Sequence, residues 1–167
     1  MLKIRPAIEK DASALATINV LGWKTAYRGL IPDDFLDTLS VTEQRIQKFA
    51  NHILETKIFL VAEDESGVVG YLSGGKTRNA DLPYPYEIYT FYVHPEAQRQ
   101  GIGTVLINAF KKKIKGASFC VYTLDGNTHA IRFYQKNGGI RRPEFDCDQK
   151  IYSLMTHELC LGFKGEK

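Results

Sequence analysis

The segment from Glu87 to Asn108, EIYTFYVHPEAQRQGIGTVLIN, constrains the fold more than any other part of the chain. Its first seven residues are mostly aromatic or β-branched and predict a strand, and the apolar period after Gly101 predicts a helix. A helix that is entered through glycines presents unpaired backbone N–H groups and the positive end of its dipole. The segment therefore predicts a phosphate-binding site made from backbone groups.

The rest of the chain predicts a single mixed α/β domain over residues 1–167. Helices are expected before a central β-hairpin, and alternating strands and helices after it. The expected strands cover residues 2–7, 57–63, 68–73, 87–93, 117–123 and 149–161, the last of them paired with a strand near 141–145. The expected helices cover residues 11–27, 33–39, 101–113 and 127–137, with a further helix that begins at Thr42.

Composition and charge exclude several classes of function. A net charge of +3 gives no general footprint for nucleic acid, and no apolar run approaches the ~18 residues of a membrane span. The three cysteines have no CxxC spacing, and the four histidines form no pair with metal-ligand spacing. We therefore expect a cytoplasmic protein with reduced thiols, no metal, and no nucleic-acid or membrane partner.

Two phosphate-binding motifs match the sequence only in part. Gly70 to Thr77 fits the spacing GxxxxGK[ST], but the prolines that follow argue against the helix that a P-loop requires, so we expect a strand. A dinucleotide motif would need a third glycine where Leu106 stands. What remains is Gln98-x-x-Gly101-x-Gly103, which the residues alone leave open as a phosphate site or as a plain connecting turn.

Three segments carry a resemblance to a known family. Gln98 to Gly103 resembles the acetyl-CoA motif Q/R-x-x-G-x-G/A of the GCN5-related N-acetyltransferases, the GNAT superfamily. Asn127-x-x-Ala130-x-x-x-Tyr134-x-x-x-Gly138 is similar to a second motif of that family. The stretch from Trp23 to Pro32 is similar to its first helix and bend, and the order of elements agrees over nearly the full length.

The resemblance implies a fold and an activity. The fold is a mixed, mostly antiparallel sheet of about six to seven strands with about four helices, splayed between the fourth and fifth strands. The activity is acetyl transfer from acetyl-CoA to a primary amine by direct attack on the thioester. The acceptor is a small-molecule amine or a protein amino group, and homodimers are common in the family. A homodimer would use the apolar C-terminal residues Tyr152, Leu154, Met155 and Leu159. The alternative is a module of the same fold that binds acyl-CoA without turnover.

The resemblance also implies which residues hold acetyl-CoA. The backbone N–H groups from Arg99 to Thr104 would bind the pyrophosphate, and the strand at Phe91 to Val93 would pair with the pantetheine arm. The backbone N–H of Val93 would polarise the thioester carbonyl. The predicted cofactor-binding residues are Phe91, Tyr92, Val93, Gln98, Arg99, Gln100, Gly101, Ile102, Gly103, Thr104, Asn127 and Tyr134.

Two residues are predicted to be catalytic. Tyr134 occupies the family's general-acid position and would protonate the thiolate; the alternative is a buried tyrosine behind an N-cap asparagine at Asn127. Glu87 would remove the proton of the amine, and regular strand alternation would place it on one face with Phe91 and Val93. Its alternative is a surface glutamate at a strand end. Acceptor binding is assigned by analogy to Trp23, Tyr27, Tyr84 and Tyr86.

Overall fold

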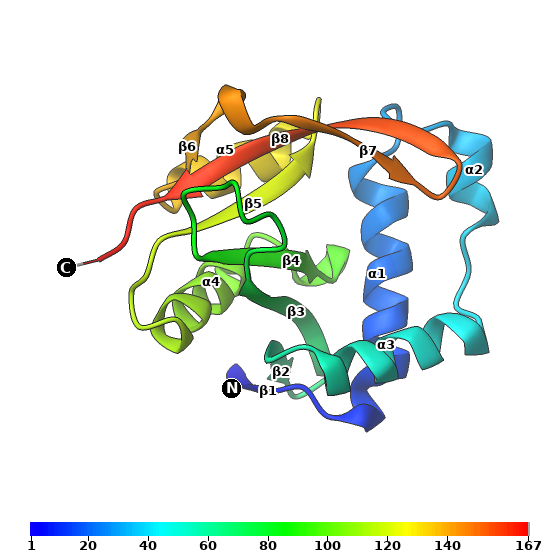
Figure 1. Ribbon diagram of the computed structural model, residues 1–167. Coiled ribbons are helices and arrows are strands. Elements are labelled where there is room, and N and C mark those ends of the chain that lie inside the picture. Colours follow the sequence, from blue (N-terminus) through cyan, green and yellow to red (C-terminus); the bar gives the residue numbers. More distant parts are fainter. Residues whose placement is uncertain (167) are drawn as a thin grey trace.

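An eight-stranded sheet with helices on both faces organises residues 1–166, which are the residues that the computed structural model describes (Figure 1). All neighbouring strands are antiparallel except β4 and β5, which are parallel. In sheet order the strands are β1 (Lys3–Pro6), β2 (Ile58–Asp64), β3 (Gly67–Lys76), β4 (Tyr86–Val93), β5 (Phe119–Leu124), β8 (Leu154–Phe163) and β6 (Ile140–Arg141), with β7 (Cys147–Ile151) also pairing with β8. The predicted α/β fold is confirmed, with one more strand than expected.

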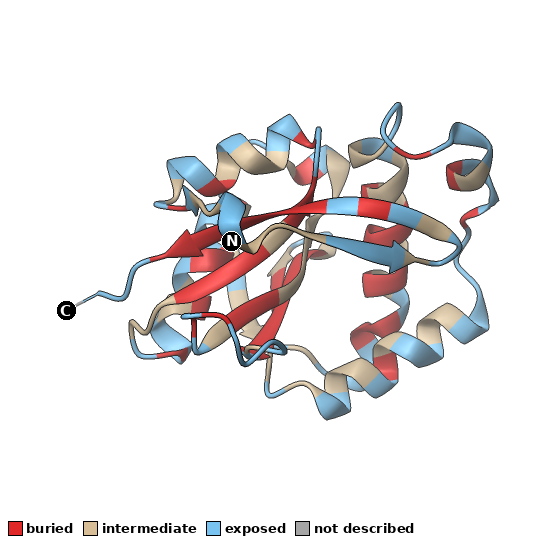
Figure 2. Ribbon diagram, turned by 45° about the horizontal axis from the view of Figure 1, so that its top comes forward, coloured by how far each residue is buried: buried red, intermediate tan, exposed pale blue. Residues whose placement is uncertain are grey.

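The helices cover the two faces unequally. On one face α1 (Ala12–Ala26) and α3 (Glu43–Glu55) pack on β2 and β3, and α2 (Asp33–Thr38) follows the end of α1. On the other face lie α4 (Ile102–Lys113) and α5 (Thr128–Lys136), whose apolar side chains join the largest core cluster. Thr42 caps α3 as predicted, because its hydroxyl accepts a hydrogen bond from the Arg45 N–H. Buried residues concentrate in the central strands and in α1 (Figure 2).

The sheet opens between β4 and β5. These strands pair only from Tyr86 to Ile88 and from Phe119 to Val121. Beyond this point β4 continues along β3 to Val93, whereas β5 continues along β8 to Leu124. The splay that the family resemblance implied is therefore confirmed, and the gap lies in the middle of the sheet.

A β-bulge precedes this gap and changes the faces of β4. Ser73 pairs with Thr90 and Gly74 with Ile88, so Tyr89 is an extra residue on β4. A bulge of this kind bends its strand and shifts the alternation of side chains. Ile88 consequently shares a core cluster with Phe91 and Val93, and the neighbouring Glu87 points to the opposite face. The prediction that Glu87 shares a face with Phe91 and Val93 is wrong for this reason.

The C-terminal segment is a hairpin instead of the single strand predicted at 149–161. β7 pairs over its length with residues 154–158 of β8, and Tyr152 adopts a positive φ of 55° in the turn between them. Leu154 and Leu159 pack within the protein, and Tyr152 contacts Trp23 and Phe35. Met155 and Tyr152, which are 69% and 52% exposed, are thus the exposed members of the apolar set that was predicted to support a homodimer.

Two further predictions concern single segments. The partial P-loop match from Gly70 to Lys76 lies within β3, so these residues form a strand as expected. Among residues 1–166, no helix is both long and apolar enough to span a bilayer.

Candidate active site

A cavity of about 1000 Å³ occupies the gap between β4 and β5. Its lining combines residues from both faces of the sheet. Phe91 and Tyr134 belong to the core cluster beneath α4 and α5, whereas Trp23 and Tyr27 come from α1 and the residue that follows it. The split in the sheet therefore creates one continuous site that connects the two faces.

One end of this cavity lies at the start of α4. Gly101 is the N-cap residue with φ of 81°, and Arg99 also has a positive φ of 62°. Two such residues coil the chain tightly, so the amides of the first turn of α4 point into the turn, which suits an anion. Arg99, Arg132 and Lys136 also line the cavity and add positive charge. This end of the cavity can bind a polyphosphate.

Gly103 has a packing role at the same place. A Cβ atom added there would lie 3.0 Å from the ring of Phe133 on α5. The small residue therefore lets the start of α4 approach α5 closely, which narrows the cavity between the two helices. Ile102 and Thr104 line the cavity as predicted, but the Gln100 side chain is outside its lining and donates a hydrogen bond to the Glu96 carbonyl at 3.4 Å.

The edge of β4 offers backbone groups to the cavity. The His94 N–H donates to the Val69 carbonyl at 2.8 Å, so His94 is in a hydrogen-bonded pair with β3. Antiparallel pairs alternate, so the N–H groups of Val93 and Phe91 point away from β3 and toward the gap. Gln98 holds this end of the strand, because its Nε2 donates to the Val93 carbonyl at 3.2 Å. An extended ligand could pair with this edge.

Tyr134 lines the cavity from α5. Its ring packs against Phe91 and Phe163, and only 6% of the residue is exposed. Among residues 1–166 its hydroxyl has no hydrogen-bond partner. Burial, reinforced by the nearby Tyr27, raises the pKa of the Tyr134 phenol well above its ordinary value. The side chain is therefore protonated at neutral pH and can donate a proton inside the cavity.

Asn127 is the N-cap residue of α5, which is the structural role that the sequence offered as its alternative. Its Oδ1 accepts a hydrogen bond from the Ala130 N–H at 3.2 Å. The residue also lines the cavity. Asn127 thus fixes the helix that carries Tyr134, and this positioning role comes from ordinary helix capping.

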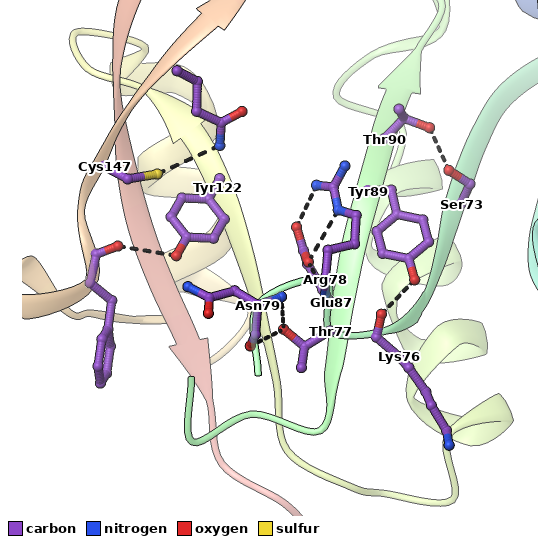
Figure 3. A network of polar contacts seen from close by, with 12 residues as sticks. Ser73, Lys76, Thr77, Arg78, Asn79, Glu87, Tyr89, Thr90, Tyr122 and Cys147 are labelled. Atoms are coloured by element: carbon purple, nitrogen blue, oxygen red, sulfur yellow. Dashed lines mark hydrogen bonds and ion pairs between the residues drawn. The ribbon is translucent and has the colours of Figure 1, made fainter. Parts of the chain in front are cut away.

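Glu87 is held by an arginine and is outside the cavity lining. The Arg78 side chain donates to the Glu87 carboxylate from Nη2 at 2.5 Å and from Nε at 3.3 Å, and the Arg78 backbone N–H donates at 3.1 Å (Figure 3). The carboxylate is buried beside Cys120 in the neighbouring strand. This arrangement corrects the predicted geometry of a general base, because three donors occupy the carboxylate and the bulge turns it away from Phe91.

Of the four residues predicted to bind the acceptor, two line the cavity and two do not. Trp23 and Tyr27 line the cavity, and the Tyr27 and Tyr92 hydroxyls lie 3.0 Å apart. Tyr84 is instead buried against Cys120 and Cys160 and accepts a hydrogen bond from Arg142 at 2.6 Å. Tyr86 packs against the main core. Tyr84 and Tyr86 lie outside the cavity lining, so the structure does not bring them together with Trp23 and Tyr27.

Sequence reasoning missed the cavity residues of the C-terminal hairpin. Glu158 on β8 and Tyr152 in the β7–β8 turn line the cavity, together with Gln149, Lys150 and Ile151 of β7. The signal for Glu158 was its alternation with Thr156 and Cys160, which places a carboxylate on the buried side of an apolar strand. Tyr152 gave no signal, since its position depends on the turn.

Comparisons with known proteins agree with this geometry. Residues 55–138 match the family model described as "Acetyltransferase (GNAT) domain". The chain is 36% identical over 173 residues to the uncharacterized N-acetyltransferase YuaI of Bacillus subtilis, covering 98% of this chain and 93% of that protein. It is 26% identical over 145 residues to a spermidine N(1)-acetyltransferase of Thermoplasma acidophilum, covering 82% and 87% of the two chains.

A solved structure shows the same fold. The PaiA N-acetyltransferase of Thermoplasma acidophilum, determined in complex with coenzyme A, superposes with a TM-score of 0.76 at 22% identity, covering 98% of this chain and 99% of that one. The match to the family model covers half of the chain, and the likeness to YuaI extends over nearly all of it. The chain therefore belongs to the GNAT family of acetyltransferases.

Proposed function

We propose that this protein transfers an acetyl group from acetyl-CoA to a primary amine by direct attack of the amine on the thioester. The observation that carries the proposal is the cavity through the split sheet. It joins an anion-binding helix start, an open strand edge and a protonated tyrosine to an aromatic pocket on the other face. Such a passage lets two substrates meet from opposite sides.

The chain's residues fit acetyl-CoA in three places. The first-turn amides of α4 and the side chains of Arg99 and Arg132 suit the pyrophosphate. The Val93 and Phe91 amides suit the peptide-like pantetheine arm, and the Val93 N–H is available to the thioester carbonyl. Acetyl-CoA supplies the activated acetyl group and the thiolate leaving group.

Tyr134 completes the proposed reaction as the general acid. The bound ammonium first loses a proton to solvent in the cavity, which frees the lone pair of the nitrogen. The neutral amine then attacks the carbonyl carbon, a C–N bond forms, and the C–S bond breaks. Tyr134 gives its hydroxyl proton to the departing sulfur, and the proton lost by the nitrogen restores the phenol through solvent in the cavity. The Tyr134 phenol carries its proton at neutral pH, so the proton is available when the thiolate forms.

An assay of CoA release over a panel of amines tests this function. We expect turnover that requires both acetyl-CoA and a primary amine, with an equal amount of acetylated amine by mass spectrometry. Calorimetry with acetyl-CoA alone measures binding separately. Tight acetyl-CoA binding with no turnover on any amine would contradict the proposal and favour a module that binds acyl-CoA without catalysis.

A further inference from the structure

We propose that Glu158 binds the ammonium group of the acceptor, and that the acceptor carries a single positive charge on an aromatic or apolar body. This inference rests on the proposed acetyl transfer, because it names the acceptor class of that site. Three features of the cavity support it: the state of the carboxylate, the charges around it and the aromatic side chains beside it.

The Glu158 carboxylate is buried without a cation. The residue is 7% exposed, and within residues 1–166 no lysine, arginine or histidine forms an ion pair with it. Its one hydrogen bond comes from the Thr156 hydroxyl at 3.2 Å, and that hydroxyl lies at the same distance from the Gln149 carbonyl. Since a hydroxyl has one proton, it cannot satisfy both oxygens. A buried carboxylate in this state requires a partner.

Burial raises the pKa of Glu158, and the hydrogen bond from Thr156 and the charge of His157 offset only part of this rise. The charge of Glu158 in turn contributes to the raised pKa of Tyr27. Glu158, Tyr27 and Tyr134 all line the same cavity, so an ammonium at Glu158 would share that cavity with the proposed acid.

The charges of the lining limit how many positive groups an acceptor can carry. Among the described residues that line the cavity, Glu158 alone has a carboxylate. Arg99, Arg132 and Lys136 are on the side of α4 and α5, where the phosphates would neutralise them. Arg78 also lines the cavity, but the Glu87 carboxylate already neutralises it. Lys48 and Lys150 line the cavity as well, and no phosphate site is proposed beside them. A polyamine would therefore meet one favourable charge and two unfavourable ones.

Aromatic rings provide the remaining contact surface for the acceptor. Trp23 lies edge-on to Tyr27 with ring centroids 4.9 Å apart, and edge-on to Tyr152 at 5.8 Å. All three side chains line the cavity. Tyr152 comes from the turn of the β7–β8 hairpin, the same hairpin that carries Glu158. The hairpin therefore brings a ring and a carboxylate to the acceptor together, which suits an arylalkylamine.

The test uses phenethylamine and spermidine as acceptors, with wild-type protein, Glu158→Gln, and Glu65→Gln as a control. Glu65 is an exposed glutamate of the β2–β3 turn, so its variant controls for the loss of one carboxylate. We expect the wild type to have the higher kcat/KM for phenethylamine. In Glu158→Gln the KM for phenethylamine should rise about 10- to 100-fold, the loss typical of a hydrogen bond to a charged group, while the KM for acetyl-CoA is unchanged. Glu158→Asp should restore part of the affinity.

A measurement on the wild-type protein alone covers the case in which Glu158→Gln does not fold. Calorimetry on the CoA-bound protein compares phenethylamine with 2-phenylethanol, its uncharged hydroxyl analogue. We expect the amine to bind about 10- to 100-fold more tightly. Equal binding of the two compounds, preference for spermidine, or an unchanged KM in folded Glu158→Gln would overturn the inference. Those results leave acetyl transfer intact, whereas absence of turnover on every amine contradicts the proposed function itself.

Discussion

Tyr134 and Glu87 are both buried polar residues, and the structure gives them opposite roles. The Tyr134 hydroxyl faces the cavity with no partner among the described residues, whereas three donors of Arg78 bind the Glu87 carboxylate. The chemistry available to a buried group depends on whether its hydrogen bonds are already made. The two residues therefore predict different outcomes when each is replaced by its closest isostere.

Removing the Tyr134 hydroxyl should slow catalysis without weakening the cofactor site. Phenylalanine fills the same space against Phe91 and Phe163, so Tyr134→Phe should unfold at nearly the wild-type temperature. General acids typically contribute about 10²- to 10⁴-fold, so we expect kcat to fall by about 100-fold or more. Steady-state kinetics and acetyl-CoA calorimetry measure the two quantities. Full activity in this variant would remove Tyr134 from the acid role.

Replacing Glu87 should affect stability and not the pH profile. Glu87→Gln leaves the Arg78 guanidinium without its anion, and we expect a loss of about 1–3 kcal/mol in the free energy of unfolding. The matched control is Glu144→Gln, whose carboxylate pairs with Arg142 at the surface, where solvent screens the pair, so this variant should unfold at nearly the wild-type urea concentration. Urea unfolding and the pH dependence of kcat/KM test this. If Glu87→Gln instead loses kcat/KM mainly at low pH while its free energy of unfolding is unchanged, Glu87 acts as the general base.

Which site residues could be predicted from the sequence depends on what fixes them. The motif residues from Gln98 to Thr104 and Tyr134 follow local patterns that a single stretch of sequence contains. Glu87 was misplaced because the bulge at Tyr89 is set by pairing with β3, which no pattern in β4 reports. Glu158 was missed because it is placed by the pairing of β8 with β7 and with β5, and β5 is far away in the sequence.

The first turn of α4 is proposed to bind acetyl-CoA through backbone N–H groups, so the backbone conformation at Gly101 should control that binding. Gly101→Ala would place a side chain at φ of 81°, which costs about 1–2 kcal/mol and displaces the first-turn amides. We therefore expect lower stability together with weaker acetyl-CoA binding. Gly29→Ala is the matched control, since Gly29 has φ of 78°, open space around it and no place in the cavity lining. The control should lose similar stability and no affinity; equal loss of affinity in both variants would contradict the backbone site.

The segment from β6 to β7 is attached to β8 through Asp146. Its carboxylate accepts hydrogen bonds from Arg141 Nη1 and Nη2 at 2.8 and 2.7 Å and from the Cys160 N–H at 2.8 Å. The Arg141 guanidinium, together with the Cys160 N–H, holds the pKa of Asp146 below its ordinary value. A depressed carboxyl pKa stabilises the fold above the unfolded value of about 3.9, and this contribution disappears as the pH falls through the folded pKa.

Asp146→Asn should therefore be less stable than wild type at pH 7, by about 1.5–3 kcal/mol. The difference between the two proteins should shrink below about pH 4, where the wild-type carboxyl also becomes protonated. Urea unfolding at pH 7 and pH 3 measures it. A difference that stays constant between these pH values would show that the ionised form of Asp146 contributes nothing.

At the scale of elements, helices and the central hairpin could be predicted, and the C-terminal hairpin could not. The helices have clear apolar periods and caps such as Thr42, and the β2–β3 turn contains a glycine. The β7–β8 turn has the residues Tyr152 and Ser153 without glycine, proline or asparagine, so local turn chemistry gave no break. Contacts of Tyr152 with Trp23 and Phe35 hold that turn instead.

For the whole molecule, hydrogen exchange can test whether the split sheet receives the cofactor. On β4 the Thr90 and Tyr92 amides point toward β3, whereas the Phe91 and Val93 amides point to the gap. Addition of CoA should slow exchange at Phe91 and Val93 more than at Thr90 and Tyr92. NMR-detected exchange resolves these neighbours, so each pair is a control for the other. Equal protection of all four amides would indicate general stabilisation and not pairing along this edge.

The order of the strands and the splay could be predicted only through the family resemblance. No feature of β4 or β5 alone states that their pairing ends at Ile88 and Val121. Beyond that point β4 stays paired with β3 and β5 with β8, each on its outer edge, so both strands continue without one another. Pairing with partners that are distant in the sequence has no local sequence signature.

The opening between β4 and β5 also has a consequence for what this protein avoids. Unpaired strand edges on a surface attract strands of other chains and cause aggregation. Here the two edges face each other across a cavity that is lined by residues of α1 and of α5, instead of forming an outer border of the sheet. The open edge of β4 is therefore offered to a ligand in the cavity and not to the strands of other chains.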